Sequence, residues 1–164
     1  MDNLSDEQAD QALRATLGCF ATGVAVVTTL TDTGQPCGLT INSFSSVSLN
    51  PPLILWSLSC DSANLKHFDQ AEFFSINILN ADQLSLCRHF ANIESDRFKD
   101  IAWQKSSHGM PVLNDVTAVI NCRTWRIDDG GDHRVYYGEI LDHHHNQQPP
   151  LIFAKGQFTR LQEA

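Results

Sequence analysis

Residues 38–52 read GLTINSFSSVSLNPP, and this stretch decides how the rest of the chain is organised. Its hydroxyl and amide side chains are interspersed with apolar ones such as Ile41, Phe44 and Val47, which a flexible serine-rich linker would lack. Burial of the apolar side chains brings the polar ones against an apolar wall, where each needs a hydrogen-bond partner. That partner is either the chain's own backbone, as in turns and bulges, or a ligand rich in oxygen atoms. The stretch alone leaves both alternatives open.

Apolar and β-branched runs on both sides of this stretch predict strands joined by tight turns. Residues 23–31 and 37–41 form one predicted hairpin, and residues 116–127 and 133–141 form another around the Gly-Gly turn at 128–132. The run 116–127 alternates between apolar and polar side chains, which predicts a half-exposed strand. The gaps between the early strands are too short for helical crossovers, so the pattern favours a mainly β, antiparallel barrel with a few flanking helices.

One substantial helix is expected at the start of the chain. Ser5 and Gln8 have the spacing of a capping box, with Leu4 as its hydrophobic staple. Apolar side chains from Ala9 to Phe20 then recur at near-helical spacing, which supports the prediction of a helix here.

The composition bounds the class of protein. The chain has 164 residues, 42% of them hydrophobic and 18% charged, which favours one folded domain over residues 1–164. The net charge of −8 opposes binding to nucleic acid, which needs a basic face. No apolar run approaches the roughly 20 residues that span a membrane, and the acidic start is unlike a secretory signal. The five cysteines form no C-x-x-C pair, so we expect free thiols in a reducing cytoplasm and no zinc site.

Histidines and cations are the remaining candidates for chemistry. His133 opens a strand directly after the Gly-Gly turn, where a side chain can overlook a barrel mouth, although a surface histidine would fit there equally. The run from His143 to His145 is expected in a solvated loop, because three successive histidines point in different directions and make a poor metal site. Arg97 and Lys66 follow polar runs and, taken by themselves, are expected as solvated charges.

Several motifs, in order along the chain, are similar to those of one known family. Residues 20–29, FATGVAVVTT, look like the first strand of the flavin reductase-like family, and residues 38–53 resemble its flavin-binding signature nearly from end to end. The motifs HFA (89–91), DRF (96–98) and GDH (131–133) follow in the family's order. The resemblance implies an FMN-binding split β-barrel, antiparallel and Greek-key-like.

The resemblance also implies which residues hold a flavin. Hydroxyl and amide side chains of residues 40–46 would line the ring edge and the ribityl-phosphate chain, while Val24 and Phe44 would contact the dimethylbenzene end. Ser62 is expected to open a short helix whose free N–H groups favour a phosphate. The expected cofactor-binding residues are Gly23, Val24, Thr40, Asn42, Ser43, Phe44, Ser45, Ser46, Ser62, Asn64, Lys66, Ala91, Arg97 and Phe153, and no metal ligand is expected.

The activity implied by the resemblance is that of an NAD(P)H:flavin oxidoreductase. A hydride would pass from nicotinamide C4 of NADH or NADPH to N5 of FMN or FAD, while the protein holds the two rings about 3–3.5 Å apart. His133 is the expected catalytic residue, beside the nicotinamide. The reduced flavin would then diffuse to a partner monooxygenase, and the chain would form a homodimer.

Three other functions stay open from the sequence. The same barrel could oxidise a substrate on bound FMN, as pyridoxamine-phosphate oxidases do, although such a site needs many cations and this chain has 11 lysines and arginines. It could also be a non-catalytic flavin-binding protein. A histidine-rich metal-binding barrel is the alternative that needs no flavin.

Overall fold

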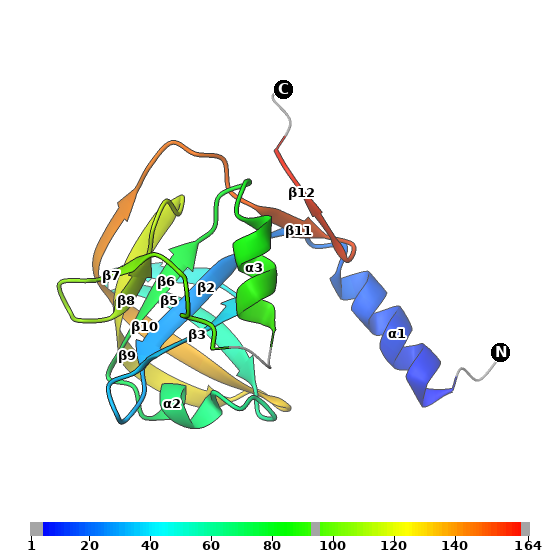
Figure 1. The fold of residues 1–164 in the computed structure, drawn as a ribbon. Helices are drawn as coiled ribbons and strands as arrows, with labels where there is room; N and C mark the ends of the chain where they lie inside the picture. The colour runs from blue at the N-terminus through cyan, green and yellow to red at the C-terminus, as the bar shows by residue number, and fades with distance from the viewer. Residues whose placement is uncertain (1–4, 93–95, 162–164) are drawn as a thin grey trace.

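The computed structural model describes residues 5–92 and 96–161, and antiparallel strands dominate it. Seven strands form one curled sheet in the order β3-β2-β6-β9-β10-β5-β4, which confirms the predicted antiparallel fold (Figure 1). β3 and β4 lie at opposite edges of this order, so the barrel is split. The strands are β2 (Ala25–Leu30), β3 (Pro36–Ile41), β4 (Ser45–Leu49), β5 (Pro52–Ser59), β6 (Phe73–Ile78), β9 (Ala118–Asp129) and β10 (His133–His145).

Smaller elements surround this sheet. A three-stranded sheet pairs β1 with β11 and β11 with β12, and a hairpin pairs β7 with β8. Helix α3 lies over β3 and β2, where it covers one side of the barrel (Figure 1). These elements are β1 (Thr22–Gly23), β7 (Trp103–Lys105), β8 (Pro111–Leu113), β11 (Ile152–Ala154), β12 (Gln157–Thr159), α1 (Asp6–Leu17), α2 (Leu65–Asp69) and α3 (Leu84–Ala91).

Two apolar cores lie on the two faces of the sheet. Inside the barrel, the Trp56 and Tyr136 rings stack with centroids 4.4 Å apart, and Phe74 packs edge-on against Trp56. On the other face, Val119 belongs to a second core built with side chains of α3 and β8. Strands between the two cores are therefore buried on both faces.

The predicted half-exposed strand at 116–127 is confirmed in its second part, where Arg123 is exposed and Cys122 is buried, but it is wrong for the first part for this reason. Asn121, which the alternation placed on the solvent side, is only 4% exposed. Its amide accepts a hydrogen bond from the Ser75 hydroxyl at 2.5 Å and donates one to the Asp142 carboxylate at 2.6 Å. Burial of this polar side chain is tolerated because both ends of the amide have partners.

The three histidines that were expected in a loop belong to a strand instead. β10 continues to His145 and pairs His143 with Ile120 and His145 with Ala118 of β9. The loop prediction is wrong because β9 is long enough to supply partners for the whole run. All three histidine side chains are exposed.

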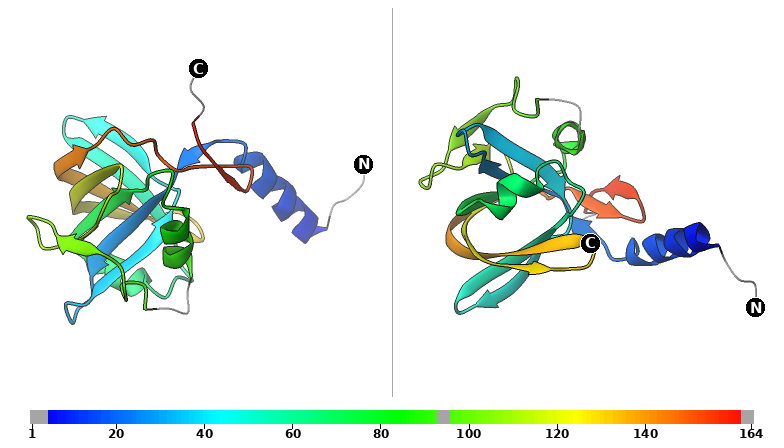
Figure 2. Two further views of the ribbon diagram at one scale, coloured as in Figure 1. Left: turned by 45° about the horizontal axis from the view of Figure 1, so that its top comes forward. Right: turned by 90° about the horizontal axis from the view of Figure 1, so that it is seen from below.

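Helix α1 stands away from the barrel in every view (Figures 1 and 2). Its capping box is confirmed, with Gln8 Oε1 accepting from the Ser5 backbone N–H at 3.0 Å, whereas the expected staple Leu4 lies outside the described residues. No residue of α1 is buried against the described part of the chain, and Leu17 is 64% exposed. No helix in the described ranges is long and apolar enough to cross a membrane.

The tight approach of β10 to the inner core gives a test of the packing. A Cβ added at Gly138 would meet Phe74 Cζ at 2.5 Å and Cys122 Cβ at 2.9 Å. We predict that Gly138→Ala lowers the free energy of unfolding in urea by about 1–3 kcal/mol, because the core has no room for the methyl group. Gly23→Ala is the control, since nothing lies within 4 Å of its added Cβ. Equal stability of the two variants would contradict the packing described here.

Candidate functional site

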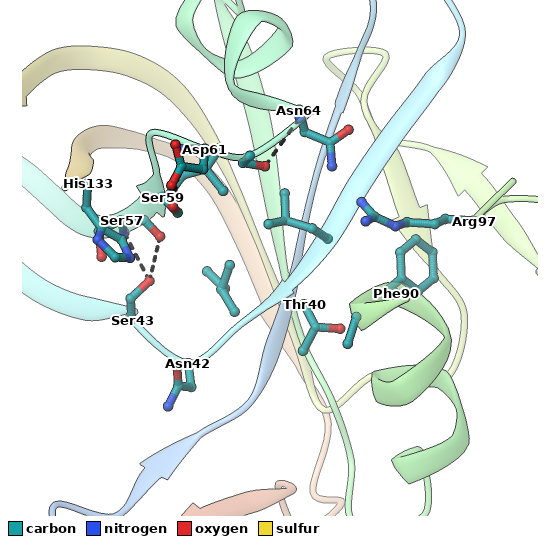
Figure 3. A pocket seen from close by; sticks show the side chains of 15 residues that line it. Thr40, Asn42, Ser43, Ser57, Ser59, Asp61, Asn64, Phe90, Arg97 and His133 are labelled. Atoms are coloured by element: carbon teal, nitrogen blue, oxygen red, sulfur yellow. Dashed lines mark hydrogen bonds between the residues drawn. The ribbon is translucent and has the colours of Figure 1, made fainter. Parts of the chain in front are cut away.

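A hollow of about 500 Å³ opens where β3 ends, between the C-terminal part of β5 and helix α3 (Figure 3). The chain that follows β3 forms one wall, the β5–α2 loop a second, and α3 with Arg97 a third. The residues that line it are Leu39, Thr40, Ile41, Asn42, Ser43, Ser57, Leu58, Ser59, Asp61, Ser62, Asn64, Phe90, Ala91, Arg97 and His133.

The structure brings eight of the predicted site residues together in this hollow. They are Thr40, Asn42, Ser43, Ser62, Asn64, Ala91, Arg97 and His133. Val24 and Phe153 line an adjoining apolar hollow of about 170 Å³, which shares Thr40 and Asn42 with the first. An apolar end of this kind suits the hydrocarbon end of a ring system.

The other predicted residues lie elsewhere. Phe44 packs against the inner core, and Ser45 and Ser46 are exposed on edge strand β4. Lys66 is exposed and its ammonium lies 3.8 Å from the Asp32 carboxylate. Neither these residues nor Gly23 lines the hollow, so their role in binding stays a prediction of the sequence.

The polar side chains of residues 40–43 divide between hydrogen bonds to the chain's own backbone, made by the two hydroxyl groups, and a free amide. Ser43 Oγ accepts from the Ser57 backbone N–H at 3.0 Å and donates to the Ser57 carbonyl at 2.9 Å (Figure 3). Thr40 Oγ1 donates to the Cys87 carbonyl at 2.7 Å. The Asn42 amide makes no hydrogen bond within the described part of the chain, so it is free to bind a ligand.

His133 is positioned by strand register. It pairs with Ser59 across β5 and β10, which places its ring at the side of the hollow formed by Ser57 and Ser59 (Figure 3). Its Nδ1 lies 2.7 Å from an oxygen of the Asp132 carboxylate, so Nδ1 carries the proton and Nε2 is left for a ligand. The hydrogen bond from His133 and its nearby charge hold the Asp132 pKa below its ordinary value.

Arg97 lies on the opposite side of the hollow (Figure 3). Its Nη1 donates to the Gly38 carbonyl at 2.9 Å and its Nε to the Asn92 carbonyl at 2.8 Å, which fixes the guanidinium in place. Burial lowers the pKa of Arg97, but a guanidinium stays charged in proteins. The expectation of a solvated charge is therefore wrong for Arg97, which is half-buried and is the one Lys or Arg among the described residues that line the hollow.

The predicted helix opening at Ser62 needs correction. α2 begins at Leu65, and Ser62 lies in the loop before it. The Ser62 hydroxyl accepts from the Asn64 backbone N–H at 3.3 Å, and the Ser62 carbonyl accepts from Leu65 N–H at 3.0 Å. These N–H groups serve the turn, so a phosphate here would depend on side chains such as Arg97 rather than on a helix terminus.

Ser57, Ser59 and Asp61 also line the hollow and were not predicted from the sequence. A signal for the serines was present, because Ser57 and Ser59 stand two residues apart on an otherwise apolar strand. Side chains at that spacing share one face of a strand. Nothing in the sequence pointed to Asp61.

The donors and surfaces of this site suit a flavin. The hollow combines an apolar end, a free amide beside its floor, and a fixed cation at its far side. An isoalloxazine ring with a phosphate tail can use each of these three features. Its volume also falls in the range of sites for small molecules and cofactors.

Comparison with known proteins identifies the family. A family model described as "Flavin reductase like domain" matches residues 17–162. The chain is 41% identical over 151 residues to the FMN reductase (NADH) SmoA of Agrobacterium fabrum, across 92% of this chain and 86% of that protein. It is 35% identical over 150 residues to HsaB of Rhodococcus jostii, the reductase subunit of a flavin-dependent monooxygenase, across 91% of this chain and 76% of that protein.

The solved structures agree with the sequence relatives. The NADH:FAD oxidoreductase SgcE6 of Streptomyces globisporus, solved with NAD and FAD fragments, matches with a TM-score of 0.90. The two chains are 32% identical, and the match covers 98% of each. The chain therefore belongs to the flavin reductase-like family.

Proposed function

We propose that this chain supplies reduced flavin to a separate monooxygenase. Its activity is that of the family: it transfers a hydride from a reduced nicotinamide, NADH or NADPH, to FMN or FAD. The observation that carries the proposal is the hollow itself, which holds His133 at one side and Arg97 at the other (Figure 3). The name of HsaB, a reductase subunit of a monooxygenase, supports an oxygenase as the consumer of the product.

The side chains divide the work of binding. Bound flavin supplies the hydride acceptor, and the nicotinamide supplies the hydride. Leu39 and Ile41 keep water from the floor, the Asn42 amide meets the polar ring edge, and Arg97 holds the phosphate. His133 holds the nicotinamide through Nε2, since Asp132 occupies Nδ1.

Turnover with free flavin is the direct test of the activity. We expect the purified protein to oxidise NADH or NADPH, seen as loss of nicotinamide absorbance, only when FMN or FAD is added. The reduced flavin should leave the protein and sustain a flavin-dependent monooxygenase held in a separate dialysis chamber. Turnover without transfer across the membrane would contradict the supply role while leaving the reductase activity intact.

His133 is expected to act on the nicotinamide side. We predict that His133→Ala raises KM for NADH about tenfold or more, because a hydrogen bond to a bound group of this kind contributes on the order of 1–3 kcal/mol. The Kd for flavin, measured by titration calorimetry, should change less than about twofold. His144→Ala is the matched control, since this exposed histidine lies far along β10. Equal losses in both constants would remove the nicotinamide role.

We further propose that the chain, folded as one domain over residues 1–164, acts as a homodimer. An isolated helix of 12 residues is marginal in water, yet α1 has no buried residue. Leu13 and Leu17 share one of its faces and are 56% and 64% exposed, and Phe20, just after the helix, is 81% exposed. A second copy of the chain would cover this face. A cytoplasmic location stays a prediction of the sequence.

The dimer has its own test. We predict that Leu17→Asp shifts the protein from dimer to monomer in sedimentation velocity, because the charge cannot be buried at an apolar contact. Gln11→Asp, on the opposite face of α1, should leave the dimer unchanged. A wild-type protein that sediments as a monomer would refute this part of the proposal.

A further inference from the structure

Trp56 and Tyr136 form a stacked pair of oxidisable rings inside the barrel. They lie directly opposite one another on β5 and β10, and their ring centroids are 4.4 Å apart with 13° between the ring planes. Trp56 is 0% exposed and Tyr136 is 1% exposed. Strand pairing therefore fixes the contact between the rings. An electron can pass between rings that are held in contact in this way without a rearrangement of the fold.

The inner core connects this ring pair to the hollow of the site. Ile41 and Leu58 belong to the same core as Trp56, and both also line the hollow. Leu58 stands two residues after Trp56 on β5, so the two side chains lie on the same face of that strand. An oxidant formed in the hollow is thus separated from Trp56 by side chains of this core.

The two rings differ in what can take up their protons. Trp56 Nε1 is buried and has no hydrogen-bond partner within residues 5–92 and 96–161, whereas the Tyr136 hydroxyl donates to an oxygen of the Asp69 carboxylate at 2.7 Å. Loss of an electron makes either ring strongly acidic, and release of the proton then stabilises the oxidised ring. Tyr136 has a proton acceptor in place, so an oxidised Trp56 would draw an electron from Tyr136.

Asp69 connects the pair to solvent. It is the last residue of α2 and is half-buried, so a proton received from Tyr136 can leave to water. Burial and the hydrogen bond to Asp69 raise the pKa of Tyr136 above its ordinary value. The hydroxyl therefore keeps its proton at neutral pH until the ring is oxidised.

We propose that Trp56, Tyr136 and Asp69 form a relay that removes single oxidising equivalents from the hollow. A one-electron oxidant takes one electron from Trp56. Tyr136 then gives one electron to Trp56 and its hydroxyl proton to Asp69. The net change is one electron gained by the oxidant, a neutral radical at Tyr136 and a protonated Asp69.

This function goes beyond the proposed hydride transfer, which moves two electrons together. Its oxidants are radicals derived from dioxygen, with which free reduced flavins react. The relay would carry the oxidising equivalent away from the residues that line the hollow, to a hydroxyl group beside a solvent-connected carboxylate.

Cys60 allows a photo-oxidant to be placed beside the hollow. It is exposed and lies in the β5–α2 loop, which forms one wall of the hollow. Cys19 is the other exposed cysteine in the described part of the chain, so Cys19→Ser directs a thiol-reactive ruthenium tris-bipyridine label to Cys60. Tyr137→Phe leaves Tyr136 as the one tyrosine, since the chain has two. A laser flash with an external electron acceptor then generates the oxidant, and transient absorption follows the tryptophan and tyrosine radicals.

We expect a tryptophan radical that decays as a tyrosyl radical forms. Trp56→Phe should abolish this transfer. Asp69→Asn should slow it roughly a hundredfold, because the amide can still accept the hydrogen bond but cannot take the proton. Asp128→Asn is the matched control, since Asp128 is also half-buried but its carboxylate pairs with Arg126.

Three results would overturn the relay. They are a tyrosyl radical that forms equally fast in Trp56→Phe, one that forms equally fast in Asp69→Asn, and a tryptophan radical that decays with no tyrosyl radical. Asp69→Asn changes a half-buried side chain by one atom and preserves its shape, so this comparison holds even if Trp56→Phe does not fold. No flavin or nicotinamide is present in the experiment, so its outcome is independent of the proposed function.

Discussion

Two hydrogen bonds between the Ser43 hydroxyl and the Ser57 backbone hold the chain after β3 against β5, at the wall of the hollow. β3 and β4 follow one another along the chain yet lie at opposite edges of the sheet, so residues 42–44 must cross between the edges. A ladder of backbone hydrogen bonds would close such a barrel completely. Here a single side chain fixes the crossing against β5, and the space beside it is the hollow of the site.

The hairpins of the sheet could be predicted because their signals are local. The strands around the turn at 128–132 carry their apolar pattern and their glycines within one stretch of sequence, and the structure pairs them as expected. Burial of the first part of β9 on both faces could not be predicted, because the second core comes from α3 and β8, far away in the sequence. The strand at His143–His145 was missed for a related reason. Its partner is the start of β9, and the three histidines themselves are polar and lack the apolar pattern of a strand.

The sequence predicted many of the residues that line the site, but not which of them are free to bind a ligand. A pattern of hydroxyl groups cannot tell which of them the backbone will use, and the fold uses Thr40 and Ser43 for itself. The position of Arg97 depends on two carbonyls, one of them on β3, so its sequence neighbours gave the opposite expectation. Only the structure shows that the Asn42 amide is free and that His133 pairs with Ser59.

Two buried cysteines lie close to the site: Cys37 on β3 lines a hollow next to that of the site, and Cys87 lines the apolar hollow with Val24. Burial raises the pKa of Cys37 to about 11 and also raises that of Cys87, so both sulfurs stay protonated at neutral pH. A protonated thiol is a poor nucleophile and resists oxidation to a disulfide. These two thiols would therefore not compete with a bound flavin for the hydride in the proposed reaction.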